Sequence, residues 1–256
     1  MDYLNRPSCD SFYLFPTSST EIETEIGKLQ LGKAVGPSSL PVNIMKLTRF
    51  VISKPLELIF NASFATGIVP SEFKVANVIP IFKNGSQYDL CNYRPISLLS
   101  IFNKILEKLM YTRLIKFLEK NNVLSEKQFG FRSGHSTQQA ILSIIDRIQR
   151  AIDHRNYSCG IFLDFSKAFD TINHNILIQK LGYYGIRGVA KDWFVSYLSD
   201  RKQFVTVNGI QSEPCEITCG VPQGSVLGPL LFLLYINDIH KYSSVLDFHL
   251  FADDAN

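Results

Sequence analysis

The sequence has little cysteine and no spacing that would pair it. The count is odd, no CxxC pair occurs, and neither a disulfide framework nor a zinc site is supported. We therefore expect ordinary buried thiols at Cys9, Cys91, Cys159, Cys215 and Cys219.

Long hydrophobic runs are also missing. The longest, 226–236, is interrupted by Gly228 and Pro229 and is shorter than the roughly 20 apolar residues of a membrane span. Met1 is followed by Asp2, Asn5, Arg6 and Ser8, so the sequence there has no apolar signal-peptide core. We expect no membrane partner and an intracellular protein, in nucleus and cytoplasm, that is not secreted.

Several catalytic signatures are absent. There is no GxSxG, no GxxxxGK[ST] and no HExxH, and the five histidines show no paired metal spacing. These absences argue against a serine hydrolase, a Walker-type nucleotidase and a zinc protease of the usual kinds.

The composition is that of a globular protein, with 46% hydrophobic and 19% charged residues and a net charge of +3. The charge is unevenly spread: residues 71–160 hold 13 Lys and Arg against 7 Asp and Glu, whereas residues 161–256 hold 7 against 10. A solvated face often produces such a split, but so does a phosphate-binding surface beside a cation-binding site.

Hydrophobic periodicity predicts a mixture of helices and strands without repeats. Strands are expected over 75–82 and 157–165, in a hairpin of 204–207 and 216–219 around Asn208-Gly209, and over 245–252. A basic loop follows the first strand as far as Arg94. Helices are expected over 20–32, 41–52, 55–66, 101–119, 137–152, 174–184, 189–198 and 226–238.

Acidic residues follow two of these apolar strands. Asp164 ends the run 159–163, and Asp253 and Asp254 follow the run 248–252. Two such strands side by side would bring Asp164 next to Asp253. Three converging carboxylates need a divalent cation, and hard oxygen ligands favour Mg²⁺ and a two-metal phosphoryl-transfer site. Alone, an Asp-Asp pair after a strand is more often a simple turn.

Other motifs accompany the aspartates in a fixed order. Segments 79–83 (IPIFK), 92–97 (NYRPIS), 164–170 (DFSKAFD), 220–225 (GVPQGS) and the Asp-Asp pair resemble, in order and spacing, the fingers and palm motifs of reverse transcriptases from non-LTR retrotransposons, with jockey-like and RTE-like elements nearest. The resemblance runs from about residue 30 to the end, and further segments agree with it: 32–37 (GKAVGP), 103–108 (NKILEK) and 128–132 (QFGFR).

This resemblance implies an α/β (α+β) fold: the fingers and palm of a right-hand polymerase, with a ferredoxin-like antiparallel palm sheet. It divides the chain into an N-terminal helical extension over 1–70, fingers over 71–135 and 175–215, and palm over 136–174 and 216–256. The chain is expected to be truncated after the Asp-Asp turn, with the thumb absent. Endonuclease and thumb regions are expected on the full-length polyprotein.

The resemblance also implies an RNA-directed DNA polymerase that uses an RNA template, a DNA primer and dNTP substrates. Two Mg²⁺ ions are expected, with Mn²⁺ as a possible substitute. Catalysis would rest on Asp164, Asp253 and Asp254, and these three with Phe165 would hold the metals. The alternative is an inert retrotransposon remnant that at most binds nucleic acid.

The remaining site residues fall into two groups. Those expected to bind the nucleotide include the gate residue, which would pack against the sugar and exclude a 2′-hydroxyl: Lys83, Arg94, Phe165, Phe169 (the gate) and Gln223. Those expected to contact nucleic acid are Phe129, Phe131, Arg132 and Gly224. Plainer interpretations stay open: solvated charges for the cations, a helix-entry turn for Gln223-Gly224, core packing for the aromatics, and a local turn for Asp170.

Overall fold

The computed structural model describes residues 10–32, 34, 36, 37, 40–165, 167–243 and 245–255. Some features expected from the sequence lie outside these residues. They are Cys9, Lys33 and Val35 of the glycine-containing motif, Ser38-Ser39 of the following turn, Ser166 and Asn256.

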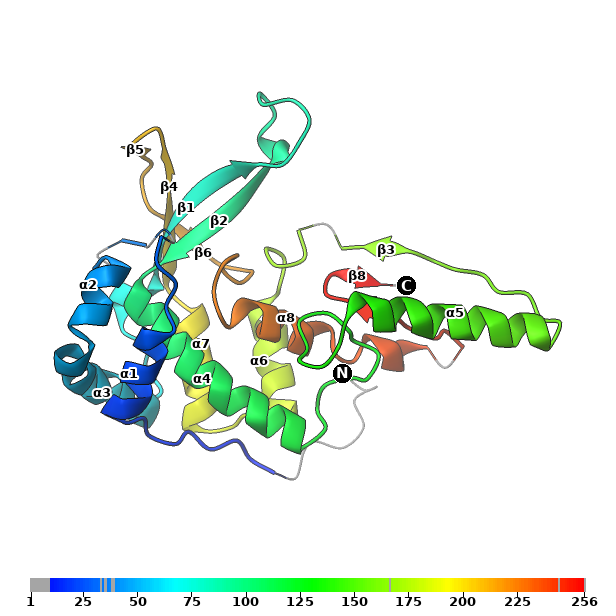
Figure 1. Ribbon diagram of the computed structural model, residues 1–256, viewed down its shortest axis with the longest axis horizontal. Helices are drawn as coiled ribbons and strands as arrows, with labels where there is room; N and C mark the ends of the chain where they lie inside the picture. The colour runs from blue at the N-terminus through cyan, green and yellow to red at the C-terminus, as the bar shows by residue number, and fades with distance from the viewer. Residues whose placement is uncertain are drawn as a thin grey trace.

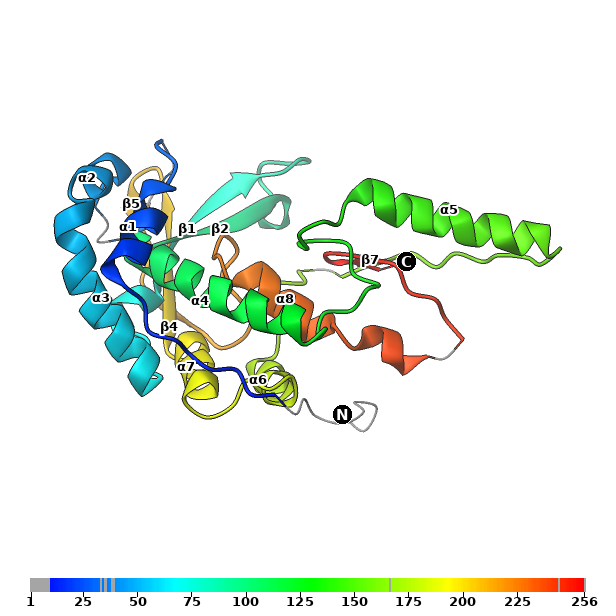
Figure 2. The same ribbon diagram turned by 60° about the horizontal axis from the view of Figure 1, so that its bottom comes forward.

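Helices form most of the body (Figures 1 and 2). Those expected over 101–119, 137–152, 174–184 and 189–198 are confirmed to within a residue at each end. The one expected over 226–238 is confirmed with shorter ends, and the first stops earlier than expected. The helices are α1 (Ser19–Gly27), α2 (Val42–Leu47), α3 (Arg49–Thr66), α4 (Ile101–Lys120), α5 (Thr137–Asp153), α6 (His174–Tyr183), α7 (Val189–Leu198) and α8 (Gly228–Ile236), with short 3-10 turns at Ser71–Lys74, Leu90–Asn92 and Ile239–Tyr242.

The boundary between α2 and α3 was wrongly expected at Pro55. The chain breaks at Thr48 instead, and α3 continues through Pro55. Its core-facing residues recur at helical spacing on both sides of the proline, so burial of one continuous stripe outweighs the missing backbone hydrogen bond. These residues are Ser53, Leu56, Phe60, Ser63 and Phe64.

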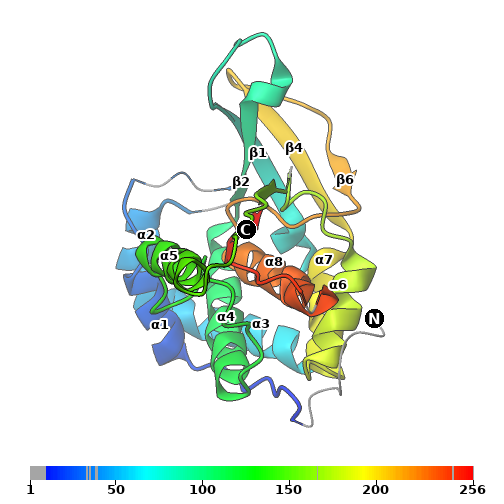
Figure 3. The ribbon, with the colours of Figure 1, turned by 90° about the vertical axis from the view of Figure 1, so that its right-hand side faces the viewer.

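A five-stranded sheet projects from the helical body (Figure 3). Its order is β2-β1-β4-β5, with β6 also pairing with β4; β1 runs antiparallel to β2 and parallel to β4. The predicted first strand is confirmed, and its partner β2 was missed because Pro95 lies inside it. The strands are β1 (Val75–Phe82), β2 (Tyr93–Leu99), β4 (Arg201–Val207), β5 (Ile210–Gln211) and β6 (Cys215–Ile217).

The expected turn at Asn208-Gly209 is confirmed. Both residues have positive φ, 50° and 81°, as a two-residue hairpin loop requires. The strand that follows directly is β5, which was not expected, and β6 then rejoins β4 one residue before the predicted second strand.

A second, antiparallel sheet lies at the other end of the molecule beside α5 (Figures 1 and 2). Its order is β3 (Leu163–Asp164), β8 (Asp254–Ala255) and β7 (Leu250–Phe251). The strands predicted over 157–165 and 245–252 were therefore too long. Tyr157 and Phe162 are 104% and 76% exposed, and within the described residues no strand pairs with them, so their apolar character does not make a strand.

The hydrophobic core lies where α1, α3, α4, α6, α7 and α8 meet, and Trp193, Tyr197 and Phe232 are among its largest buried side chains. The expectation of buried thiols was wrong: Cys91, Cys159, Cys215 and Cys219 are all exposed. Within the ranges that the structure describes, no helix is long and apolar enough to cross a membrane.

Candidate functional site

Strand pairing brings the three aspartates together. β3 runs antiparallel to β8 with Asp164 opposite Asp254, and the Phe165 amide donates to the Asp253 carbonyl at 3.4 Å. The convergence expected from the sequence is found, but the residue directly opposite Asp164 is Asp254, with Asp253 one position away. Asp164 and Asp254 are exposed and Asp253 is half-buried, so all three lie at a solvent-accessible edge.

The Asp253-Asp254 pair lies where the tight hairpin turn between β7 and β8 ends. Phe251 pairs with Asp254, which leaves Ala252 and Asp253 as the two loop residues. Ala252 has φ of 57°, a value that non-glycine residues rarely adopt and that persists only where neighbouring structure enforces it. Asp253 is therefore presented from a constrained turn.

The three carboxylates offer hard oxygen ligands of the kind that Mg²⁺ and Mn²⁺ prefer. Among the residues that the structure describes, no three His, Cys, Asp or Glu side chains are grouped closely enough to hold a metal ion. The donor chemistry fits a divalent cation, and the backbone pairing places the three aspartates on neighbouring strands and the turn beside them, but their carboxylates are not grouped as a metal site in this conformation.

Lys83 and Arg94 lie on an exposed arm formed by β1 and β2. Lys83 follows β1, its amide donates to the Asn92 carbonyl at 2.8 Å, and Arg94 faces Ile81 across the strand pair. Both side chains are exposed, and neither pairs with a carboxylate of the described residues. In Figure 1 the arm rises on the same side of the body as β3.

The loop 220–225 is fixed between β2 and the segment after β3. The Gln223 side chain donates to both carboxylate oxygens of Asp170, each at 3.0 Å. The backbone carbonyl of Gln223 accepts from the Ser97 amide at 2.8 Å. A Cβ on Gly224, whose φ is 107°, would lie 3.0 Å from the Ser97 carbonyl oxygen. Asp170, for which only a local turn was expected, thus also connects the segment after β3 with the loop 220–225.

The gate candidate Phe169 is held by other aromatic rings. Its centroid lies 5.0 Å from that of Phe232 and 6.1 Å from that of Phe131. Phe169 is half-buried, so part of the ring remains accessible in front of these neighbours. The packing fixes the ring's position.

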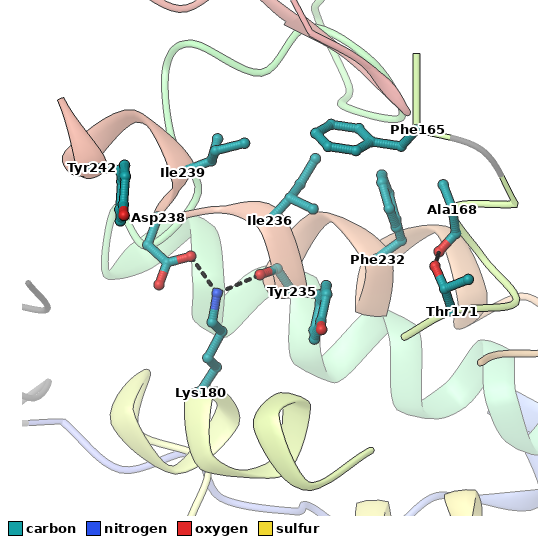
Figure 4. A pocket seen from close by; sticks show the side chains of 10 residues that line it. All are labelled: Phe165, Ala168, Thr171, Lys180, Phe232, Tyr235, Ile236, Asp238, Ile239 and Tyr242. Carbon is teal, nitrogen blue, oxygen red and sulfur yellow. Dashed lines mark hydrogen bonds and ion pairs between the residues drawn. The ribbon is translucent and has the colours of Figure 1, made fainter. Parts of the chain in front are cut away.

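Phe165 turns its side chain into an apolar pocket next to α8 (Figure 4). On the opposite side of this pocket Lys180 donates to Asp238 at 2.5 Å and to the Tyr235 carbonyl at 2.6 Å. The backbone N–H of Phe165 meets the hairpin by donating to the Asp253 carbonyl.

The segment that carries Phe129, Phe131 and Arg132 lies along β7. The Phe129 amide donates to the Leu250 carbonyl at 2.8 Å, and the ring contacts His135. Arg132 donates to the Ser125 carbonyl at 2.7 Å, so its guanidinium is engaged within its own loop. Phe131 is 52% exposed.

A charged cluster holds the chain ahead of β7. Asp247 pairs with Lys127 and with Arg147 of α5. Burial raises the pKa of Asp247, but the hydrogen bond and charge of Lys127 and the charge of Arg147 outweigh it and hold the pKa below its usual range. The pairs thus favour the ionised carboxylate and fasten α5 to this edge.

Comparison with known proteins gives a consistent result. A family profile described as "Reverse transcriptase (RNA-dependent DNA polymerase)" matches residues 81–256. The "Probable RNA-directed DNA polymerase from transposon BS" of Drosophila melanogaster is 35% identical over 246 residues, 93% of this chain and 26% of that protein. The "RNA-directed DNA polymerase from mobile element jockey" of the same species is 33% identical over 255 residues, 96% of this chain and 27% of the relative. The chain thus spans about a quarter of the length of these curated relatives.

Proposed function

The chain belongs to the reverse transcriptase family, and from this we propose that it is the fingers and palm of an RNA-directed DNA polymerase of a non-LTR retrotransposon. The observation that carries the proposal is the antiparallel pairing of β3 with β8, which brings Asp164 opposite Asp254 and beside Asp253. In this proposal residues 1–70 are the helical extension, 71–135 and 175–215 the fingers, and 136–174 and 216–256 the palm.

The reaction joins a dNTP to a primer. The primer 3′-hydroxyl attacks the α-phosphorus, the bond between the α- and β-phosphates breaks, and pyrophosphate leaves. Two divalent cations, Mg²⁺ or Mn²⁺, would activate the hydroxyl and stabilise the leaving oxygen when bound. Asp164, Asp253 and Asp254, with the Phe165 backbone, are the groups of this chain that would hold them.

The substrate contacts follow from exposure and charge. Lys83 and Arg94, which pair with no carboxylate of the residues that the structure describes, lie on the exposed β1–β2 arm, where an ammonium and a guanidinium suit the triphosphate. Gln223 and Gly224 hold the loop against β2 on the nucleotide side, with the Gln223 amide anchored by Asp170. Phe129, Phe131 and Arg132 support the template, and the exposed Phe131 ring is the one available for stacking.

The proposal is tested by primer extension with a chimeric protein that has the full length of the jockey relative. Residues 1–256 replace the matching segment of the jockey protein, and extension is measured on an RNA template with Mg²⁺ and dNTPs. Extension that needs both the template and all four dNTPs supports the proposal. Binding of RNA without extension contradicts it and favours an inert remnant, and phosphate-ester hydrolysis without extension favours a metal-dependent hydrolase.

Phe169 gives a prediction about sugar selection. Phe169→Val removes the ring that excludes a 2′-hydroxyl, so the ratio of kcat/KM for dNTP over rNTP is expected to fall at least about tenfold. A ratio is measured because a general loss of stability affects both substrates alike. Phe50→Val, the same change at an exposed phenylalanine of α3, should leave the ratio unaltered; an unaltered ratio in Phe169→Val would remove the gate assignment.

A further inference from the structure

Gln128 contacts the turn that carries Asp253. Its side chain is buried, with 3% exposure. The amide oxygen accepts from the Ala252 N–H at 2.9 Å and from the Gly130 N–H at 2.7 Å. The amide nitrogen donates to the Ala252 carbonyl at 3.3 Å. One side chain thus binds both backbone polar groups of Ala252.

Ala252 is the residue that needs this support. It is the first loop residue of the hairpin and has φ of 57°. A side chain that binds both its N–H and its C=O stabilises this orientation of the peptide groups, and the next residue is Asp253. The position of the Asp253 carboxylate therefore depends on Gln128.

Gly130 permits the close approach. A Cβ at this position would lie 2.2 Å from the Ala252 nitrogen and 2.9 Å from the Phe251 carbonyl carbon. The neighbouring backbone is also paired, because the Leu250 amide donates to Lys127 and the Phe129 amide to Leu250, both at 2.8 Å. Residues 127–130 thus form a clamp along β7 and under the turn.

We propose that Gln128 is a positioning residue that sets the geometry of the Asp253-Asp254 turn for metal binding. The effect of Gln128 on catalysis rests on the proposed polymerase function, whereas the contact of Gln128 with the turn is independent of that function. A carboxamide is required because it both accepts and donates, whereas an ionised glutamate keeps the acceptor and loses the donor.

Hydrogen exchange in the 256-residue chain tests the contact without any activity. Gln128→Ala is expected to speed exchange of the 250–255 amides at least about tenfold, because the Ala252 N–H loses its partner. Gln128→Glu should give an intermediate rate, because it keeps the acceptor for the Ala252 N–H and loses the donor to the Ala252 carbonyl. Gln149→Ala, the same change at an exposed residue of α5, should match the wild type. Unchanged exchange at 250–255, or equal acceleration in the β1–β2 arm, would overturn the proposal.

Primer extension in the jockey chimera tests the catalytic consequence. Gln128→Ala is expected to raise the Mg²⁺ concentration for half-maximal rate by about 10–100-fold, as loss of a group that orients a metal ligand does. The KM for dNTP should stay constant because Lys83 and Arg94 lie on a separate arm. A changed KM with an unchanged Mg²⁺ requirement contradicts a positioning role. If the wild-type chimera does not extend primers at all, the polymerase proposal fails, while hydrogen exchange still decides whether the clamp exists.

Discussion

Asp253→Asn is expected to lower the rate of primer extension in the jockey chimera at least about a thousandfold. Each factor of ten corresponds to about 1.36 kcal/mol of lost transition-state stabilisation, and removing a charged metal ligand removes several kcal/mol. Asparagine keeps the size of the side chain and the backbone carbonyl that accepts from Phe165, so the hairpin should persist. Binding of the RNA–DNA hybrid should therefore change little.

Further variants separate the loss of a carboxylate charge from a loss of the fold. Asp164→Asn should show the same loss, because Asp164 faces Asp254 across the strand pair, and the double variant should be little worse than either single one, since residues of one site act as a unit. Asp153→Asn, at the exposed end of α5, serves as the control. Activity within about tenfold of wild type in either active-site variant would exclude these aspartates as metal ligands.

Elements with a local signal were predictable. The start of α5 has a capping box between Ser136 and Gln139, and the observed bounds of α7 equal the predicted ones. The dipeptide Asn208-Gly209 specifies its turn locally. The strands failed where partners decide the outcome. The apolar run 157–165 forms a strand only at Leu163–Asp164, where β8 pairs with it, and β2 exists despite Pro95 because β1 lies alongside.

The same distinction applies to the site. Two apolar runs that end in acidic residues predicted that Asp164 would lie beside the Asp-Asp turn, because such runs indicate neighbouring strand ends. The register could not be predicted, since both residues of β3 are exposed and no buried face specifies which residues pair. The contacts of Gln128 with Ala252 and of Asp170 with Gln223 join segments far apart in the chain. No local pattern marks such pairs.

Glu107 offers the largest expected effect on stability. It is fully buried in α4 and accepts from the Tyr197 hydroxyl at 2.8 Å, the Asn103 amide at 2.8 Å and the Val226 N–H at 2.5 Å. The side chain therefore joins α4, α7 and the start of α8, directly after the loop of Gln223. Burial raises the pKa of Glu107, opposed by the nearby charge of Arg201 and by the hydrogen bonds from Tyr197 and Val226.

Glu107→Ala is expected to lower the free energy of unfolding by about 3–5 kcal/mol, because it leaves several buried donors unpaired and removes the electrostatic interaction with the fully buried Arg201. Denaturant unfolding of the 256-residue chain measures this. Glu119→Ala, on the exposed side of the same helix, should cost no more than about 0.5 kcal/mol. Equal effects of the two substitutions would show that the buried network contributes nothing to stability.

The pH dependence of the unfolding free energy shows which protonation state of Glu107 the folded protein favours. Since the folded pKa of Glu107 lies above the ordinary value of 4.5, the folded state binds this proton more tightly than the unfolded state. The stability that this proton contributes is fully present below 4.5 and is lost as the pH rises through the folded pKa. Glu107→Gln cannot titrate, so the unfolding free energy of the wild type relative to this variant should fall over the same interval. A difference that stays constant, or that rises with pH, would mean that the folded pKa is not raised and that Glu107 is held mainly by Arg201.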